Sequence, residues 1–478
     1  MNRPPAQHPG NAQTLVGETL PLSYRIGLAT LVFTAFLTQA KFIPVIRNNI
    51  GPFEVVGLLV ITAFFVSPRT RRPLALNTAT QAVLAILAIT VISQINIPDG
   101  RRGAGLINVA IQVFFALFLV TLFNLLRQHK VDPKTLLQWV ALALLIVGPW
   151  IILAGLDTQV SVQEVGPFRN RAHMASYMLT AFWMALVYSQ WPTLGSRAKL
   201  MAYSGVGMTL YAVAVSGRRS VYLSLLVGLL SLGVIFLIAS HSKRWRLVVA
   251  GFFIMGVIYA MYQFGPRYLP QLEFFQDRVS MIDDRLGAAL TISEDEAIEK
   301  GFFALQREGV RNAFLAHPIV GIGWGGFAKS HYSPTGHEVH STPMRFLAET
   351  GLIGLALYIV LMMTLALSVW RGFILMRRTA FGNAYLVLAV GFSSLLISYA
   401  YNRHVTERTF WLLMAVTFSM ELFAARFLTS ARLAATQRAS ERSAPEAQVN
   451  EASNPETGPP RHRGPALAPH VEPWATRT

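Results

Sequence analysis

The chain contains no cysteine and few charged residues. The absence of cysteine excludes disulfide bonds, thiolate nucleophiles and cysteine-ligated metal centres. Only 14% of the residues are charged, 53% are hydrophobic, and the mean hydropathy is +0.44. Hydrophobic runs close to the roughly 20 residues that a helix needs to cross a bilayer recur along most of the 478 residues. The composition therefore predicts one polytopic membrane protein rather than a set of soluble domains.

Several familiar motifs are also missing. No HExxH motif or similar cluster of metal ligands occurs, and the one candidate exception, Asp283-Asp284, is typical of a solvated acidic pair, so we expect no metal and no cofactor. The glycine-rich stretch 321–326 lacks the Gly-Lys-Ser/Thr of a phosphate-binding loop. Residues 1–20 are polar and lack the hydrophobic centre of a cleavable signal peptide, so we expect none.

The hydrophobic runs predict an all-α, polytopic bundle of twelve membrane-spanning helices. Lys and Arg cluster in every second loop, and the positive-inside rule places those loops and both termini in the cytoplasm. We therefore attribute the net charge of +17 to topology and anionic lipid, and not to binding of nucleic acid. The predicted spans are 24–46, 50–67, 74–95, 104–126, 134–155, 172–192, 198–216, 220–240, 247–264, 343–368, 383–401 and 409–427.

This topology divides the chain into five segments. Residues 297–314 have the apolar spacing of an amphipathic helix, which His317-Pro318 should end. The C-terminal stretch is rich in Ala, Pro, Ser, Glu and Arg and has little that could form a core, so it is expected to be disordered. The segments are a cytoplasmic N-terminus (1–23), nine spans (24–264), a large periplasmic loop (265–342), three spans (343–429) and a disordered cytoplasmic tail (430–478).

A polar, glycine-rich segment with three histidines, His331, His337 and His340, precedes the tenth span. Pro343 favours a first helical turn with Thr342 as N-cap, so His340 should lie just before the helix. The partial positive charge of a helix N-terminus disfavours a protonated imidazole, which leaves a neutral histidine that can act as a base. The alternative, a glycine-rich connection with a solvated or capping histidine, remains open at this point.

Arginines also occur in the short loops that the topology places outside the cytoplasm. Headgroup anchoring is one explanation, and a site for an anionic lipid-linked substrate is the other, because guanidinium groups match phosphate oxygens. Arg218 and Arg219 are the strongest candidates for such a site, since a short turn holds them at the membrane boundary. The outward arginines are Arg47, Arg101, Arg102, Arg169, Arg171, Arg218, Arg219, Arg403 and Arg408.

Three stretches resemble the O-antigen ligase and O-antigen polymerase superfamily of bacterial membrane glycosyltransferases. The first is RNAFLAHPIVGIGWGGF at 311–327, followed by His340 and FLAETGLIG at 346–354. The others are GPFRNRAHMAS at 166–176 and SGRRSVY at 216–222. The resemblance implies inverting, metal-independent transfer of a glycan from undecaprenyl diphosphate at the periplasmic face of the bacterial inner membrane. The implied acceptor is a lipid A core sugar for a ligase, the reading we favour, or another glycan repeat for a polymerase.

The resemblance also implies roles for individual residues. His340 would activate the acceptor hydroxyl, with His337 as the alternative base, and Arg218 or Arg219 would bind the donor diphosphate. A second arginine is expected in the large loop, where Arg307 and Arg285 are the two candidates. The remaining supporting candidates are His337, Glu349, Arg311, Arg169 and His173.

Two other classes of function stay open. A transporter of lipid-linked sugars would use the same arginines but would need no base in an outer loop. A structural or signalling membrane protein would need neither. Within the glycosyltransferase reading, the sequence does not separate ligase, polymerase and protein-glycosylating relatives, because they share the donor and differ in the acceptor.

Overall fold

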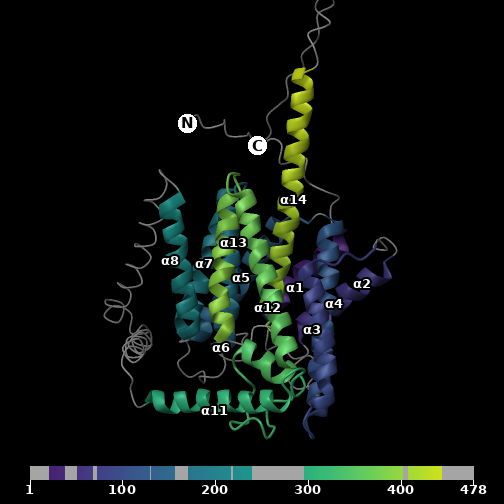
Figure 1. The fold of residues 1–478 in the computed structure, drawn as a ribbon. Helices are drawn as coiled ribbons and strands as arrows, with labels where there is room; N and C mark the ends of the chain where they lie inside the picture. The colour runs from purple at the N-terminus through teal and green to yellow at the C-terminus, as the bar shows by residue number, and fades with distance from the viewer. Residues whose placement is uncertain are drawn as a thin grey trace, which may run out of the picture. The chain divides into compact units, whose positions relative to one another are not determined.

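A computed structural model describes residues 21–37, 51–67, 73–129, 131–156, 171–216, 219–239, 295–401 and 407–443 of the chain. These residues form twelve α-helices and one 3-10 turn and contain no β-strand (Figure 1). The predicted all-α class is therefore confirmed for this part of the chain. The elements are α1 (Leu22–Thr34), α2 (Pro52–Val66), α3 (Thr78–Ser93), η3 (Gln94–Asn96), α4 (Arg102–Gln128), α5 (Pro133–Leu156), α6 (Arg171–Ser189), α7 (Ser196–Ser216), α8 (Arg219–Ala239), α11 (Asp295–Ala316), α12 (Thr342–Met376), α13 (Gly382–Tyr401) and α14 (Arg408–Ser443).

Six of the described helices are long and apolar enough to cross a membrane: α3 with η3, α4, α5, α12, α13 and α14. Four more are apolar but shorter, namely α1, α2 and the stretches Met174–Ser189 and Ser220–Ile235 of α6 and α8. Neither group includes α7, although the sequence predicts a span at 198–216. These helices identify the chain as a membrane protein. The predicted ninth span, 247–264, lies outside the described residues.

Contacts gather the helix ends into two groups. At one end, the side chain of Arg408 at the start of α14 bonds to Glu54 of α2 and to the carbonyl of Leu37 after α1. The backbone N–H of Arg408 bonds to the hydroxyl of Tyr177 in α6. At the same end, Ser341 before α12 bonds to the carbonyl of Ala400 near the end of α13. We call this the site end, because it contains the candidate functional residues.

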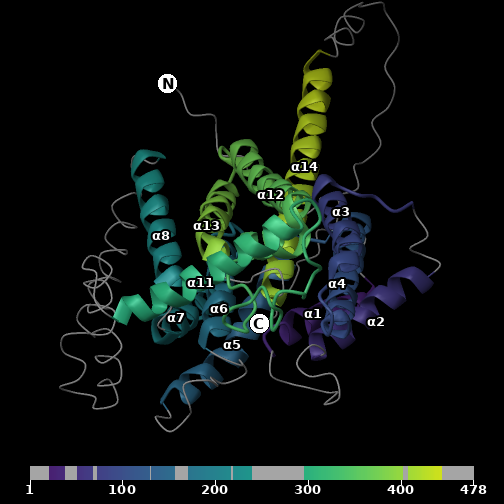
Figure 2. The same cartoon turned by 60° about the horizontal axis from the view of Figure 1, so that its bottom comes forward.

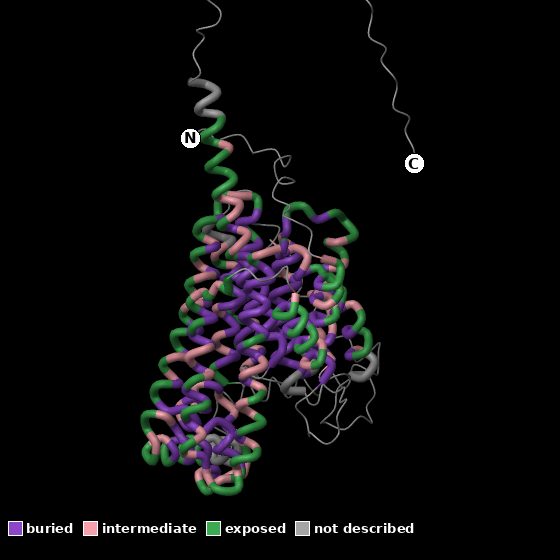
Figure 3. The backbone as a smooth tube through the Cα atoms, turned by 90° about the vertical axis from the view of Figure 1, so that its right-hand side faces the viewer, coloured by how far each residue is buried: buried purple, intermediate pink, exposed green. Residues whose placement is uncertain are grey.

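The opposite end joins the other helix termini. Tyr24 of α1 bonds to the carbonyl of Ala63 in α2, and the Asn124 side chain of α4 pairs with the backbone of Ala75 before α3. The described helix ends joined by these contacts thus form two sets, as an up-and-down arrangement requires. Buried residues follow the helix faces that pack on one another (Figure 3).

The amphipathic helix expected at 297–314 is present as α11, which ends at Ala316 directly before His317-Pro318. It runs across the start of α12 instead of alongside the upright helices (Figures 1 and 2). Gly309 allows a close approach here, because a Cβ atom added at this position would lie 2.3 Å from the carbonyl oxygen of Tyr332.

Several predicted helix boundaries are wrong. The helix predicted at 24–46 ends at Thr34, because α1 runs from Leu22 to Thr34 and Ala35 and Phe36 form a turn. The residue that precedes α12 as its N-cap is Ser341 and not Thr342, and its side chain makes no capping hydrogen bond. The predicted helix 343–368 is longer and is interrupted at Gly351, whose φ of 66° is not helical. Helix α14 continues to Ser443, so residues 430–443 are helical where disorder was expected, and 444–478 lie outside the described residues.

Candidate functional site

The interruption of α12 at Gly351 shapes the site. A broken helix leaves backbone N–H and C=O groups without their usual partners, and buried groups of this kind must find others. The loop between α11 and α12 supplies them through four backbone hydrogen bonds: Ile322 N to Ala348 O (3.0 Å), Gly323 N to Glu349 O (3.0 Å), Leu352 N to Pro318 O (2.9 Å) and Ile353 N to Ile319 O (3.3 Å). The glycine-rich loop therefore completes the broken helix.

Glycine is required where the two segments meet. Gly321 and Gly351 both have positive φ, at 70° and 66°. A Cβ atom at Gly351 would lie 2.4 Å from the carbonyl of Ile319, and one at Gly321 would lie 2.3 Å from the carbonyl carbon of Glu349. Both the backbone conformation and the space thus exclude a side chain at these positions.

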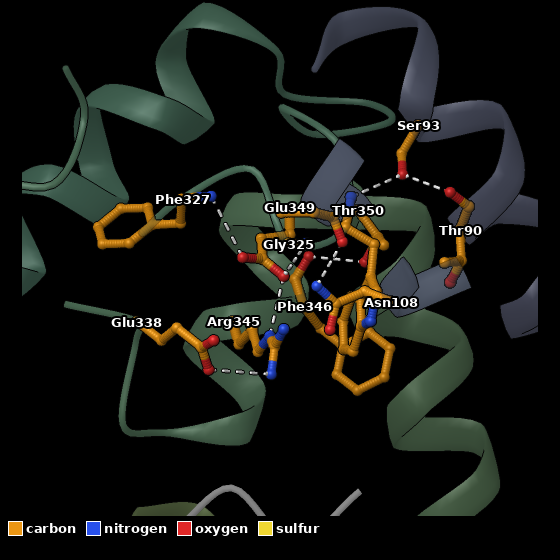
Figure 4. Close-up of polar contacts among 12 residues, drawn as sticks. Thr90, Ser93, Asn108, Gly325, Phe327, Glu338, Arg345, Phe346, Glu349 and Thr350 are labelled. Carbon is orange, nitrogen blue, oxygen red and sulfur yellow. Dashed lines mark hydrogen bonds and ion pairs between the residues drawn. The ribbon is translucent and has the colours of Figure 1, made fainter. Parts of the chain in front are cut away.

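The carboxylate of Glu349 lies at the centre of this assembly (Figure 4). It is completely buried and accepts hydrogen bonds from Arg345 Nε (2.8 Å), Gly325 N (2.9 Å) and Phe327 N (3.3 Å). Glu349, predicted as a supporting residue, therefore fixes the conformation of the glycine-rich loop. A buried carboxylate with these three donors stabilises the loop, because both of its oxygens are paired.

Arg345 is a residue to which the sequence analysis assigned no role. Arg345 is 3% exposed, and its guanidinium lies 4.4 Å from the ring centroid of Trp324 and approaches the Glu338 carboxylate at 3.7 Å. The sequence carried a signal for it: Arg345 and Glu349 are four residues apart at the start of an apolar helix, where opposite charges face each other. Among the described residues, Arg345 Nη2 has no hydrogen-bond partner.

The turn between α3 and α4 holds the other side of the loop. Gln94 and Asn96 donate to the carbonyls of Trp324 (3.3 Å) and Gly321 (3.0 Å), respectively. Arg101 donates to the carbonyl of Gly325 at 3.1 Å. Arg101, for which lipid anchoring and substrate binding were the two explanations, thus supports the glycine-rich loop.

An apolar cluster lies between α11, the loop and the start of α12. We call it the loop core, and its buried members are Val310, Ala313, Ile322, Phe327, Val339 and Ala348. Tyr332, Met344 and Leu347 pack against it. The loop core and the Glu349 carboxylate together give the segment before α12 a defined conformation.

His340 directly follows Val339 of the loop core and precedes the first turn of α12. Its side chain is partly exposed, and its Nδ1 lies 3.1 Å from the backbone carbonyl oxygen of Glu338. A carbonyl can only accept a hydrogen bond, so Nδ1 carries the proton and Nε2 is the basic nitrogen of the neutral ring. The geometry therefore selects a tautomer that can act as a base through Nε2.

The predicted diphosphate ligands are described only through the backbone of α8. Arg218 lies outside the described residues, and the side chain of Arg219, the first residue of α8, is likewise not described. The packing of α8 on α13 nevertheless fixes the level of Arg219. Ser224 bonds to the carbonyl of Ser394, and Gly228 and Gly391 both pack on the ring of Trp183, so the two helices run antiparallel.

This register places the start of α8 at the site end. With a rise of 1.5 Å per residue, Arg219 lies about 7.5 Å along α8 from Ser224, and Ala400 lies about 9 Å along α13 from Ser394. Both steps run in the same direction. The backbone of Arg219 is therefore level with Ala400, whose carbonyl bonds to Ser341 beside His340.

The remaining predicted residues have different outcomes. Arg307 and Arg311 are exposed on α11, and His337 is exposed in the loop. The other three fall outside what the structure describes: Arg285 and Arg169 entirely, and His173 in its side chain. Within the described part of the chain, no group of three His, Asp or Glu residues could hold a metal ion.

Arg408 forms an ion pair with Glu54. Its Nε and Nη2 bond to the two oxygens of Glu54 at 2.8 and 2.7 Å, and the two side chains are only 10% and 14% exposed. Glu54 also accepts from the N–H of Gly51 at the start of α2. Arg408 therefore joins α2 to α14, and its fork of donors is already occupied by a carboxylate.

Comparison with known proteins adds no family to these observations: no protein-family model matches the chain, and no curated protein matches it either.

Proposed function

We propose that the chain is a membrane glycosyltransferase of the O-antigen ligase and polymerase type. It would move a glycan from undecaprenyl diphosphate to an acceptor hydroxyl at the periplasmic face of a bacterial inner membrane, with lipid A core as the acceptor in the ligase reading. A polymerase, which would use a glycan repeat as the acceptor, is the alternative within the same chemistry.

The observation that carries the proposal is the environment of His340. A sugar hydroxyl is a poor nucleophile at neutral pH, so its attack needs a base within hydrogen-bond reach. The contact between Nδ1 and the Glu338 carbonyl leaves Nε2 as the proton acceptor, and the partial exposure of the ring allows a substrate to approach. His337, the alternative base, is exposed on the loop.

The position of α8 supports the proposed role of its arginines in binding the diphosphate leaving group. A diphosphate leaving group gains negative charge as the glycosidic bond breaks, and fixed guanidinium groups stabilise that charge. Arg219 begins α8 at the same end of the bundle as His340, and Arg218 precedes it. Direct displacement then follows: the acceptor oxygen forms the new bond to the anomeric carbon, its proton passes to His340, and undecaprenyl diphosphate leaves.

The test uses the full chain in proteoliposomes with a lipid-linked glycan, offering core lipid and free glycan repeat as competing acceptors. We expect His340→Gln to abolish transfer, whereas His331→Gln, which alters an exposed histidine in tilted ring contact with Tyr332, should retain it. Full transfer by a folded His340→Gln protein would refute the assigned base. Movement of the lipid across the bilayer with no new glycosidic bond would instead identify a transporter.

The arginines can be tested separately through donor binding. Charge-assisted hydrogen bonds contribute about 1.5 to 3 kcal/mol, so Arg218→Gln or Arg219→Gln should raise the KM for donor by roughly 10- to 100-fold. Arg102→Gln is the matched control, because this exposed arginine pairs only weakly with exposed Asp99, at 3.5 Å. Equal KM values in all three variants would remove the diphosphate role.

A further inference from the structure

Glu338 is the residue at which three parts of the site meet. Its carboxylate pairs with Arg345 at 3.7 Å, and its backbone carbonyl lies 3.1 Å from His340 Nδ1. The same carbonyl accepts a hydrogen bond from Gln306 Nε2 of α11, also at 3.1 Å. Gln306 is 3% exposed, so α11 holds this carbonyl from inside the protein. The location of the Glu338 carbonyl therefore decides where the imidazole of His340 can form its hydrogen bond.

Arg345 has a fixed position from which to hold Glu338. Its guanidinium is clamped on one side by the buried Glu349 carboxylate and stacks over Trp324. Glu349 is in turn bonded to the N–H groups of Gly325 and Phe327. The Glu338 side chain is 38% exposed, and its ion pair with Arg345 adds a side-chain contact to the hydrogen bond by which Gln306 holds the Glu338 carbonyl. Figure 4 shows the sequence of contacts from the loop through Glu349 and Arg345 to Glu338.

We propose that Arg345 and Glu338 form a positioning pair that sets the orientation and the tautomer of His340. This inference rests on the proposed function for its kinetic consequence, since it makes His340 the group that takes the proton. Neither residue touches the reacting atoms in this scheme. Arg345 fixes Glu338, the Glu338 carbonyl accepts the Nδ1 hydrogen, and Nε2 is thereby directed to the acceptor hydroxyl.

A positioning role predicts an effect on kcat with little effect on KM. The Glu338 side of the ion pair is 38% exposed and its closest approach to Arg345 is 3.7 Å. Solvent-screened pairs contribute up to about fivefold in an equilibrium, so Glu338→Gln should lower kcat about two- to fivefold. Arg345→Lys removes the planar guanidinium fork that contacts both Glu338 and Glu349, so it should lower kcat further than Glu338→Gln does. Both substitutions break the same contact between Arg345 and Glu338, so the double variant should be no slower than Arg345→Lys alone.

A second readout does not depend on glycosyl transfer. Diethylpyrocarbonate modifies neutral imidazole, and peptide mass spectrometry gives its rate at His340 and, as an internal control, at exposed His331. We expect Glu338→Gln to change the rate at His340 by about two- to fivefold and to leave the rate at His331 unchanged. The proposed function fails if the wild-type chain transfers no glycan, and the positioning pair can still be judged from the modification rates.

Two results would overturn the positioning pair. One is an unchanged kcat and an unchanged His340 modification rate in folded Glu338→Gln protein. The other is strict additivity of the two substitutions in the double variant, which would show that Arg345 and Glu338 act independently. Glu338→Gln alters a partly exposed side chain, so this test does not depend on whether Arg345→Lys folds.

Discussion

Replacing Glu349 by Gln should open the glycine-rich loop. The wild-type carboxylate pairs both of its oxygens, with Arg345 and with the N–H groups of Gly325 and Phe327. A glutamine keeps one oxygen but replaces the other by an NH2 group. This NH2 donor then faces one of the N–H groups that the carboxylate accepted from. The guanidinium of Arg345 also loses its closest carboxylate and retains only Glu338 at 3.7 Å.

The expected cost follows from the burial of these groups. Removing one partner of a buried ion pair costs about 3–5 kcal/mol, because the other charge is left without compensation. Glu338 still offers partial compensation, so we expect the lower limit, about 3 kcal/mol. That corresponds to roughly a hundredfold larger population of the opened loop.

Tryptic cleavage after Lys329 measures this opening. Lys329 is exposed and lies two residues beyond Phe327, in a turn closed by the hydrogen bond from its N–H to the Gly336 carbonyl. Cleavage follows the open population when reclosing is fast, so its rate in Glu349→Gln protein should rise about a hundredfold. Glu308→Gln, which neutralises an exposed carboxylate on α11, is the matched control. Equal cleavage rates in Glu349→Gln and wild-type protein would refute the argument.

Two further predictions concern packing and the site end. Gly309→Ala should lower the free energy of unfolding by about 1–3 kcal/mol, and with it the apparent Tm, because the new Cβ would meet the Tyr332 carbonyl. Gly207→Ala, whose Cβ would have no atom within 4 Å, should instead raise the free energy of unfolding by up to about 1 kcal/mol. Similar Tm values for both variants would contradict the close approach of α11. Arg408→Gln should cost about 3–5 kcal/mol, and adding Glu54→Gln should restore part of the loss in a double-mutant cycle of thermal unfolding; an additive double variant would show that the two side chains do not interact.

Most of the described helices could be predicted from the sequence, because a long uninterrupted run of hydrophobic residues is a local signal for a membrane helix. The sequence also located α11, whose apolar spacing and His-Pro end are local signals. It did not predict the break at Gly351. The segment around this glycine is as apolar as an uninterrupted helix, and the groups that satisfy the broken backbone come from residues 318–323, which are distant in sequence.

The candidate site shows the same division between local and distant information. The place of His340 before a helix could be predicted, because Pro343 marks the helix start. The roles of Arg101 and Arg408 could not be predicted, because the sequence does not show that Gly325 and Glu54 are their partners. Opposite charges that meet across the bundle leave no periodic pattern in the sequence.

The proposed function needs a second arginine for the donor diphosphate, and the partners of the described arginines bear on which residue it is. Arg101 and Arg408 are held by protein groups, whereas Arg307 and Arg311 are exposed on α11. Helix α11 buries Gln306, Gly309, Val310 and Ala313 against the loop. At 100° per residue, Arg307 lies about 110° from the centre of that buried face and Arg311 lies about 150° from it. Both arginines therefore lie outside the buried face of α11, with Arg307 about 40° nearer to it. Arg307 is the better first choice of the two for testing as a ligand of a diphosphate bound beside His340.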